Sequence, residues 1–182
     1  MKNRIYLVAW MLFLFSILPK QVFSSTGVIG VAAGADHSCI LKSDEAICFG
    51  NNTFGQGIPI NGFKNARQIV SGSYHNCVID DDGLWCWGYN GSGQTNVPAG
   101  LKDVKAISAS GGHTCALDVV GVKCWGENYS GQTNVPASLK EVKAIFAGGG
   151  HTCALDAGGV KCWGENYSGQ TNVPANLKDI KA

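Results

Sequence analysis

The chain has 182 residues, of which 45% are hydrophobic and 15% charged, so it has enough apolar side chains for a core and is not expected to be intrinsically disordered. Its 14 basic side chains nearly balance 13 acidic ones. This balance argues against a nucleic-acid partner, because a protein that binds phosphate backbones needs concentrated positive charge.

The first 24 residues have the layout of a secretory signal peptide. Lys2 and Arg4 precede an apolar run over residues 5–18, and small residues follow near Ser24. A membrane anchor is the alternative, but this run is shorter than the roughly 20 residues that span a bilayer. We therefore predict a signal peptide over 1–24 and a secreted or periplasmic protein that does not contact the membrane after cleavage. Cleavage removes three basic side chains and leaves 11 against 13 acidic ones.

The rest of the chain is an internal repeat with a fixed period of 38 residues. Each unit contains a histidine, a cysteine two positions later and a second cysteine eleven positions after the histidine. The repeated histidines are His37, His75, His113 and His151. The predicted units are 28–65, 66–103, 104–141 and 142–179, and residues 180–182 correspond to the start of a further repeat. A period of this length is typical of solenoids, propellers and other arrays.

Short strands, not helices, are expected within each unit. Glycine accounts for 25 of the 182 residues and recurs every few positions, which helices tolerate poorly. In the last unit the segments 142–147, 151–155 and 160–164 read as short strands, the last two flanking a tight turn at Ala157 and Gly158. We therefore predict three or four antiparallel strands per unit.

This hairpin register places the two cysteines of a unit opposite each other. Pairing Asp156 with Gly159 brings Cys153 to face Cys162, at a separation suited to a disulfide. The same count gives one local bridge in every unit: Cys39 with Cys48, Cys77 with Cys86, Cys115 with Cys124, and Cys153 with Cys162. Zinc bound by His151 and the two cysteines is the alternative, but the closely spaced cysteine pair typical of zinc sites is missing and the exported setting favours oxidation.

The repeated aromatic and histidine positions are interpreted as structural. Alternation along the strand turns the tryptophan after each second cysteine to the opposite face of the sheet, where it is expected to pack against a neighbouring unit. These residues are Trp87, Trp125 and Trp163. Because all four histidines share one repeated position, we expect each to make a structural hydrogen bond rather than to act in catalysis.

The unit resembles a known repeat family. The phrase "HTCALDAGGVKCWGENYSGQ", preceded by "AIFAGGG" and followed by "TNVPA", is similar to the repeat of the regulator of chromosome condensation family of β-propellers. Its "GQTNVPA" connection most resembles bacterial secreted propellers that inhibit β-lactamases. The resemblance covers 28–179 and implies all-β architecture with four-stranded blades around an axis.

The number of units departs from the family pattern, which is usually seven blades. Four blades of about 38 residues are expected to form either a partial open arc or a small closed ring, and an arc is open to completion by a second copy in a homodimer. A longer protein that continues past residue 182 is a further alternative.

Function is expected to reside in the loops, because the fold serves many roles. No unit adds a distinct nucleophile or carboxylate to its histidine, so we expect neither an enzyme nor a cofactor. The three aspartates 80–82 are expected to be solvated turn residues, with a weak calcium contact as the alternative. The candidate partner-binding residues are those that vary between units near the turns: Asp36, Phe54, Tyr74, Tyr89, Tyr129 and Tyr167.

Three functional hypotheses follow. The first is an exported, non-enzymatic module that binds a protein partner through these loop residues. The second is an inhibitor of a secreted enzyme such as a β-lactamase, although the loops before His113 and His151 lack aromatic residues. The third, by family analogy only, is a guanine-nucleotide-exchange regulator of a Ran-like GTPase, which the signal peptide contradicts.

Overall fold

The computed structural model describes residues 27–175 and 177, which form four antiparallel sheets, here called blades 1 to 4. Blade 1 contains β1 (Gly30–Ala33), β2 (His37–Leu41), β3 (Glu45–Gly50) and β4 (Ile60–Asn61). Blade 2 contains β5 (Gln68–Ser71), β6 (His75–Asp80) and β7 (Gly83–Gly88). Blade 3 contains β8 (Ala106–Ser110), β9 (His113–Leu117) and β10 (Val122–Gly126). Blade 4 contains β11 (Ala144–Ala147), β12 (His151–Asp156) and β13 (Gly159–Gly164).

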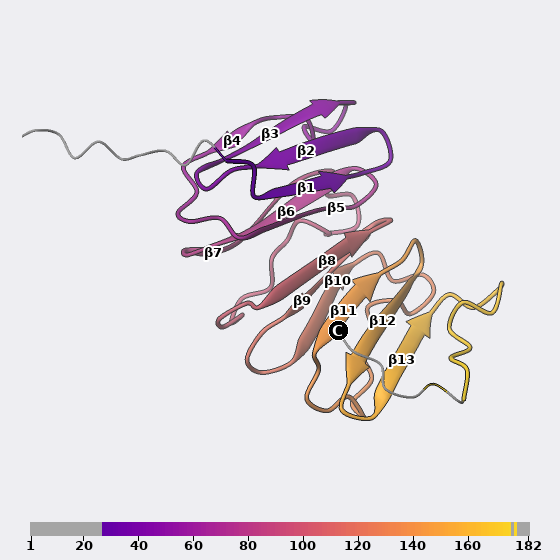
Figure 1. Cartoon of the computed structure of the whole chain (residues 1–182). Helices are drawn as coiled ribbons and strands as arrows, with labels where there is room; N and C mark the ends of the chain where they lie inside the picture. The colour runs from indigo at the N-terminus through magenta and orange to yellow at the C-terminus, as the bar shows by residue number, and fades with distance from the viewer. Residues whose placement is uncertain (1–26, 176, 178–182) are drawn as a thin grey trace, which may run out of the picture.

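The blades follow one another along the chain as a partial propeller arc. Figure 1 shows them in succession, from the indigo blade 1 to the orange and yellow blade 4, with no contact between the first and the last. The first strands β1, β5, β8 and β11 contact one another in turn along the arc. The all-β prediction is confirmed, and of its two alternatives the open arc is the one observed. The predicted signal peptide (1–24) and the start of a further repeat (180–182) lie outside the described residues.

A fourth strand is present in blade 1 and in no other blade of the described chain. There, Ile60 of β4 pairs with Ala46 of β3. The equivalent positions 38, 76 and 114 residues later are prolines: Pro98, Pro136 and Pro174. Proline has no backbone N–H to donate to a ladder, so these connections do not extend the sheet. The resemblance implied four strands throughout, and this substitution explains why three are found in blades 2 to 4.

The predicted central hairpin and its disulfide are present in every blade. Asp156 pairs with Gly159 and Cys153 with Cys162, as expected from the turn at Ala157 and Gly158. The paired cysteines have Cα atoms 4.0 to 4.1 Å apart in all four blades. All eight cysteines are consumed and none is free, so the zinc alternative is wrong for these residues.

Glycine ends the last strand of each hairpin for a steric reason. Gly126 has a φ of 101°, a conformation that side chains rarely adopt, and an added Cβ would lie 2.5 Å from the carbonyl oxygen of Gly112. This close approach lets the Glu127 N–H donate to the same carbonyl, at 2.9 Å. The "CWG" motif therefore fixes the exit of the chain into the loop that follows.

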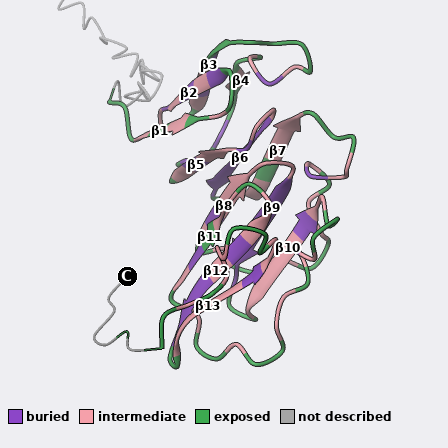
Figure 2. Ribbon diagram, turned by 90° about the vertical axis from the view of Figure 1, so that its right-hand side faces the viewer, coloured by how far each residue is buried: buried purple, intermediate pink, exposed green. Residues whose placement is uncertain are grey.

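Each blade has two different faces, and the core lies between blades. The face toward the previous blade, here called the leading face, carries an aliphatic residue of the first strand and a tryptophan, which is replaced by Phe49 in blade 1. The face toward the next blade, here called the trailing face, carries the disulfide and a leucine or isoleucine. The cluster between blades 3 and 4 illustrates this: Cys115, Leu117, Ile145, Ala154 and Trp163. Figure 2 shows the buried positions concentrated on the strands, with the connecting loops largely exposed.

Two of the three predicted tryptophans are buried at these junctions. Trp125 lies against Cys77 and Ile79 of blade 2, and Trp163 against Cys115 and Leu117 of blade 3. Trp87 is partly buried against blade 1, where it contacts Phe63 with ring centroids 6.4 Å apart. The described part of the chain contains no helix long and apolar enough to cross a membrane.

Candidate functional site

The repeated histidines bridge neighbouring blades. His75 Nε2 lies 2.8 Å from the Thr114 hydroxyl of the next blade, and this hydroxyl donates to the Gln94 carbonyl at 3.0 Å. Since the hydroxyl proton is used there, Thr114 accepts from His75. His113 makes the same contact with Thr152, at 2.9 Å. Nε2 is therefore occupied in holding two blades together.

The first histidine follows the same scheme with a different partner. His37 Nε2 lies 2.7 Å from Asn76 Oδ1, and the Asn76 amide nitrogen donates to the Gln56 carbonyl. An asparagine in place of the threonines keeps one acceptor and one donor in position. His151 has no equivalent neighbour among the described residues and is partly exposed.

Burial controls the protonation of the central histidines. Burial, together with the charge that His113 would carry, lowers the pKa of His75 to about 4. Burial and His151 in the same way lower the pKa of His113 to about 4. Both rings are therefore neutral at pH 7. Their Nδ1 atoms are buried without a hydrogen-bond partner, which is consistent with a neutral ring that keeps its proton on Nε2.

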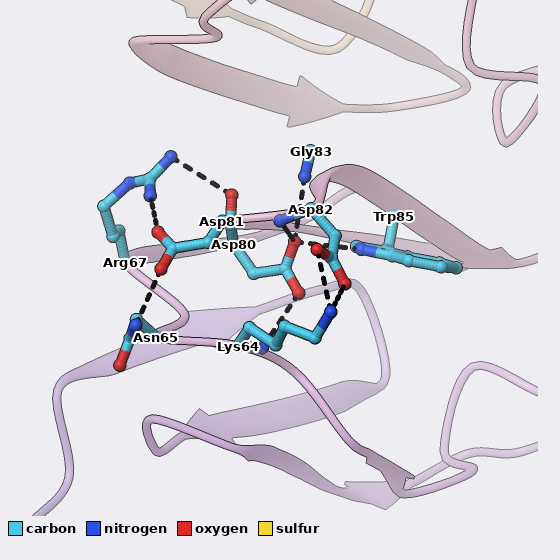
Figure 3. A network of polar contacts seen from close by, with 8 residues as sticks. All are labelled: Lys64, Asn65, Arg67, Asp80, Asp81, Asp82, Gly83 and Trp85. Carbon is cyan, nitrogen blue, oxygen red and sulfur yellow. Dashed lines mark hydrogen bonds and ion pairs between the residues drawn. The ribbon is translucent and has the colours of Figure 1, made fainter.

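The aspartates 80–82 form an ordered network with neighbouring cations (Figure 3). Arg67 contacts Asp81 at 2.7 Å and Lys64 contacts Asp82 at 2.8 Å. Asp80 is buried and accepts from the indole nitrogen of Trp85 at 3.0 Å. No group of three or more potential metal ligands occurs in the described residues. These carboxylates therefore close and brace a hairpin turn, and their negative charge is shared with cations.

Asp80 accepts backbone hydrogen bonds at its hairpin turn, and later blades have an aspartate with the same role. Asp118 and Asp156 occupy the same position and accept the backbone N–H groups of Lys102 and Lys140, each at 3.1 Å. The hydrogen bond from the Lys161 side chain, at 2.6 Å, helps to hold the pKa of Asp156 below its ordinary value. The carboxylates at this edge of the arc are therefore structural.

The opposite edge carries the predicted partner-binding residues and is here called the loop face. Tyr89 donates its N–H to the Tyr74 carbonyl at 2.8 Å, and Asn51 does the same to Asp36. These bonds join the loop before each histidine to the loop after each glycine-terminated strand. The candidate residues from both kinds of loop therefore lie along one edge of the arc.

Over blades 1 and 2 the loop face carries an aromatic cluster. The ring centroids of Phe54 and Tyr89 are 4.7 Å apart, and those of Phe54 and Tyr74 are 5.6 Å apart. Phe54 and Tyr89 are exposed, whereas Tyr74 is half-buried. Asp36 is exposed in the loop that precedes His37. Three of the predicted aromatics are thus brought into contact by adjacent blades.

Over blades 3 and 4 the loop face carries two isolated tyrosines. Tyr129 and Tyr167 are 91% and 92% exposed, and with Glu165 and Asn166 they line a shallow groove. The loops themselves are well fixed: the Ser130 N–H donates to the side chain of buried Gln132, at 2.9 Å. The tyrosines therefore project into solvent from an ordered support.

Sequence reasoning missed two carboxylates on this face. The Glu127 side chain lies over Gly112 and the Glu165 side chain over Gly150. A Cβ added to either glycine would be 2.6 Å from a carboxylate oxygen of the glutamate above it. In blade 2 the equivalent pair is Tyr89 and Tyr74. The loops before His113 and His151, which lack aromatic residues, are therefore covered by a carboxylate from the neighbouring loop. Comparing these two positions jointly across the repeats would have revealed the exchange.

The fold and its loop face define a repeat protein of the β-propeller type with an open arc of blades. The regulator of chromosome condensation (RCC1) repeat model matches residues 28–56, 66–94, 104–132 and 142–170, each match beginning at the first residue of one 38-residue unit. The chain therefore belongs to the RCC1 repeat family. Comparison with curated protein sequences gave no match.

Solved structures share the fold at low sequence identity. Human WBSCR16 is 22% identical with a TM-score of 0.67, over 75% of this chain and 47% of its own. Prp20p from Saccharomyces cerevisiae, described with its binding to Gsp1p and histones, is 19% identical with a TM-score of 0.66, over 79% of this chain and 47% of its own. The ectodomain of the receptor kinase CR4 from Physcomitrella patens is 28% identical with a TM-score of 0.62, over 82% of this chain and 44% of its own. The chain thus spans about half the length of each.

The four disulfides also indicate the compartment. Disulfides persist in oxidising environments and are rare in the cytosol. All eight cysteines of the chain are paired within their own blades. The protein is therefore suited to an extracellular or otherwise oxidising compartment.

Proposed function

We propose that the protein is an exported, non-enzymatic module that binds a protein partner through its loop face. The observation that carries this proposal is the projection of Tyr129 and Tyr167 from ordered loops, on the same edge as the Phe54 and Tyr89 cluster. Tyrosine and phenylalanine bury a large contact area at a low entropic cost, which makes them suitable anchors.

The arrangement of charge supports a partner with mixed apolar and basic character. Glu165 lines one groove with the two exposed tyrosines, Glu127 lies two positions before Tyr129, and Asp36 is exposed on the same edge of blade 1. The turn carboxylates on the opposite edge are paired with Lys64, Arg67 and Lys161 and are less available. A partner that presents apolar side chains flanked by lysine or arginine would complement the loop face.

The proposed absence of catalysis is supported by the state of the histidines. His75 and His113 are buried, neutral and already bonded between blades, so neither offers a proton to a bound substrate. Secretion or periplasmic export is proposed from the disulfides together with the predicted signal peptide. The likeness to the CR4 ectodomain supports the same compartment.

Inhibition of a secreted enzyme such as a β-lactamase is the second candidate function. The pair of projecting tyrosines favours it, because an inhibitor needs anchors that reach into an active-site cleft. Titration of a panel of purified β-lactamases with the protein tests it, and unchanged hydrolysis rates throughout would discard it. The likeness to Prp20p rests on the fold alone and gives no support for nucleotide exchange on a GTPase.

The binding proposal is tested by removing the anchors in pairs. The immobilised protein is exposed to the exported proteins of its source cells, and the retained proteins are identified by mass spectrometry. We expect specific partners to be retained by the wild type and lost by Tyr129→Ala/Tyr167→Ala, by Phe54→Ala/Tyr89→Ala or by both, each pair weakening binding by about 2 kcal/mol or more. Val120→Ala, an exposed change on the opposite edge, is the matched control. Retention that is the same for all variants would refute the proposal.

A further inference from the structure

The leading face of blade 1 is exposed although its counterparts are buried. Val31 is 73% exposed, whereas Ile107 at the equivalent position of blade 3 is 3% exposed. Phe49 is 55% exposed, whereas Trp125 at its equivalent position is 9% exposed. Ile40, directly opposite Val31 in the sheet, is also partly exposed. Blade 1 thus exposes apolar side chains at the positions that, in each later blade, pack against the preceding blade.

The trailing face of blade 4 is exposed in the complementary way. Cys153 is partly exposed, whereas Cys115 at the equivalent position of blade 3 is fully buried. Phe146, which stands directly opposite Cys153, is 63% exposed. Blade 4 therefore exposes a disulfide and an aromatic ring on the face that is equivalent to the one by which blade 3 packs against blade 4.

These two faces match each other because both belong to one repeated junction. Between blades 3 and 4, Cys115 and Leu117 receive Ile145, Ala154 and Trp163. At a junction between blade 4 and blade 1 of another chain, Cys153 and Phe146 would receive Val31, Ile40 and Phe49, whereas Leu155 is already 7% exposed within one chain. Val31 is smaller than Ile145 and Phe49 is smaller than Trp163, but Ile40 is larger than Ala154. The total side-chain volume inserted by blade 1 is therefore similar to that inserted by blade 4.

The histidine contact of the junction also finds its partners, whereas the bond from the Ala147 N–H to Ser108 Oγ would not be repeated, because Phe146 occupies the equivalent position in blade 4. His151 is the member of the histidine series that lacks a neighbour in the described chain, and Ser38 is the equivalent of Asn76, Thr114 and Thr152. A serine hydroxyl can accept from the imidazole and donate to a carbonyl as Thr152 does. The Gln170 carbonyl would accept this donation, as the Gln132 carbonyl accepts that of Thr152.

We propose that a second copy of this chain docks head-to-tail on the first, the leading face of blade 1 on the trailing face of blade 4. Two such junctions close a ring of eight blades, within the roughly four to eight that propellers contain. Two copies in succession also correspond to about the full length of the similar solved structures. The proposal does not rest on the loop face, but in such a ring both loop faces lie on the same side.

The first test is the mass of the exported protein in solution, from about 1 μM to about 100 μM, by light scattering coupled to gel filtration. We expect twice the mass of one chain. Val31→Asp, which places a charge in the junction, is expected to raise the dissociation constant at least about a hundredfold. Val120→Asp is the matched control, since this valine is 72% exposed on a hairpin turn, and it should dimerise as the wild type does.

A mixing experiment establishes the head-to-tail sense. Phe146→Asp blocks the trailing face as Val31→Asp blocks the leading face, so each variant alone is expected to be a monomer. When mixed, they should form an open dimer, because the intact leading face of one variant can meet the intact trailing face of the other. No dimer in the mixture, or dimerisation of either variant alone, would overturn the proposed junction.

A strengthening change separates association from folding. Phe49→Trp restores an indole whose nitrogen, in Trp125 and Trp163, donates to a glutamine carbonyl of the preceding blade at 2.9 Å. We expect dimerisation about twenty-five-fold tighter, because the closed dimer gains one hydrogen bond, worth about fivefold, at each of its two junctions. A monomer throughout the concentration range, or a ladder of longer oligomers in place of a dimer, would overturn the closed ring.

Discussion

His75 and His113 are held neutral between neighbouring blades, because burial in the junction disfavours the charged ring. In the unfolded chain both would have a pKa near the ordinary value of about 6.5. Their folded pKa of about 4 is lower, so the unfolded state binds more protons between these values. The stability that the neutral rings contribute is present above about pH 6.5 and is lost as the pH falls toward 4. We expect a loss on the order of 3 kcal/mol for each histidine.

Urea unfolding at pH 7.5, 6, 5 and 4.5 measures this loss. In His75→Gln/His113→Gln the slope between pH 6.5 and 4.5 should become much shallower, because glutamine does not titrate and can still donate to Thr114 and Thr152. If this variant does not fold, proton titration of the imidazoles by NMR in the wild type provides the same answer. Titration of both rings near pH 6.5 would contradict the assignment.

The histidine bonds illustrate what sequence could and could not predict at this scale. A shared repeat position predicted a common structural role for all four histidines. It could not predict the partners, because His75 and Thr114 are 39 residues apart and meet only when one blade stacks on the next. The exposure of Tyr129 and Tyr167 was predicted from their turn position, whereas the glutamates beside them became evident only from the loop geometry.

At the scale of the element, each hairpin is closed by a disulfide of the same loop length, which makes the four bridges comparable. Each joins cysteines nine residues apart, so the chain-entropy contribution is equal, about 2 to 3 kcal/mol. Cys115–Cys124 is in addition packed under Trp163 and Ile145, whereas Cys153 is partly exposed. We therefore expect Cys115→Ala/Cys124→Ala to cost about 1 to 2 kcal/mol more than Cys153→Ala/Cys162→Ala.

Chemical denaturation of the two double variants at the same protein concentration measures the difference. The comparison is well matched, because blades 3 and 4 have nearly identical hairpin sequences. It should be made in the Val31→Asp background, so that association does not contribute to the measured stability. Equal losses for the two bridges would show that packing against the next blade adds nothing to the entropic effect.

The hairpins and the outer strands differ in how far local sequence determines them. Cysteine spacing, the turn and strand alternation predicted the pairing of Cys153 with Cys162 without reference to the rest of the fold. The fourth strand depended on a single position, since Ile60 can donate to the ladder and Pro98 cannot. That signal was present in the sequence, but the family resemblance favoured four strands in every blade.

For the whole molecule, stability is expected to follow the number of covered faces. Within residues 27–175, blades 2 and 3 are packed on both sides, whereas the leading face of blade 1 and part of the trailing face of blade 4 are exposed. In repeat proteins each unit is stabilised mainly by its nearest neighbours, so the end blades should open more readily than the central ones. Periodicity alone predicted the four units but left the closure of the array open, because closure depends on the rotation between blades.

Hydrogen exchange at two protein concentrations resolves the state of the ends. In the dilute monomer, the amides of β1–β3 and β11–β13 should exchange faster than those of β6 and β9 by about tenfold to a hundredfold, the loss of one junction. Once a second copy covers both ends, the exchange rates of all four blades should become similar. Val31→Asp should retain fast-exchanging ends at every concentration, and Val120→Asp should follow the wild type. Uniform protection in the dilute monomer would mean that the junctions are not the units of stability.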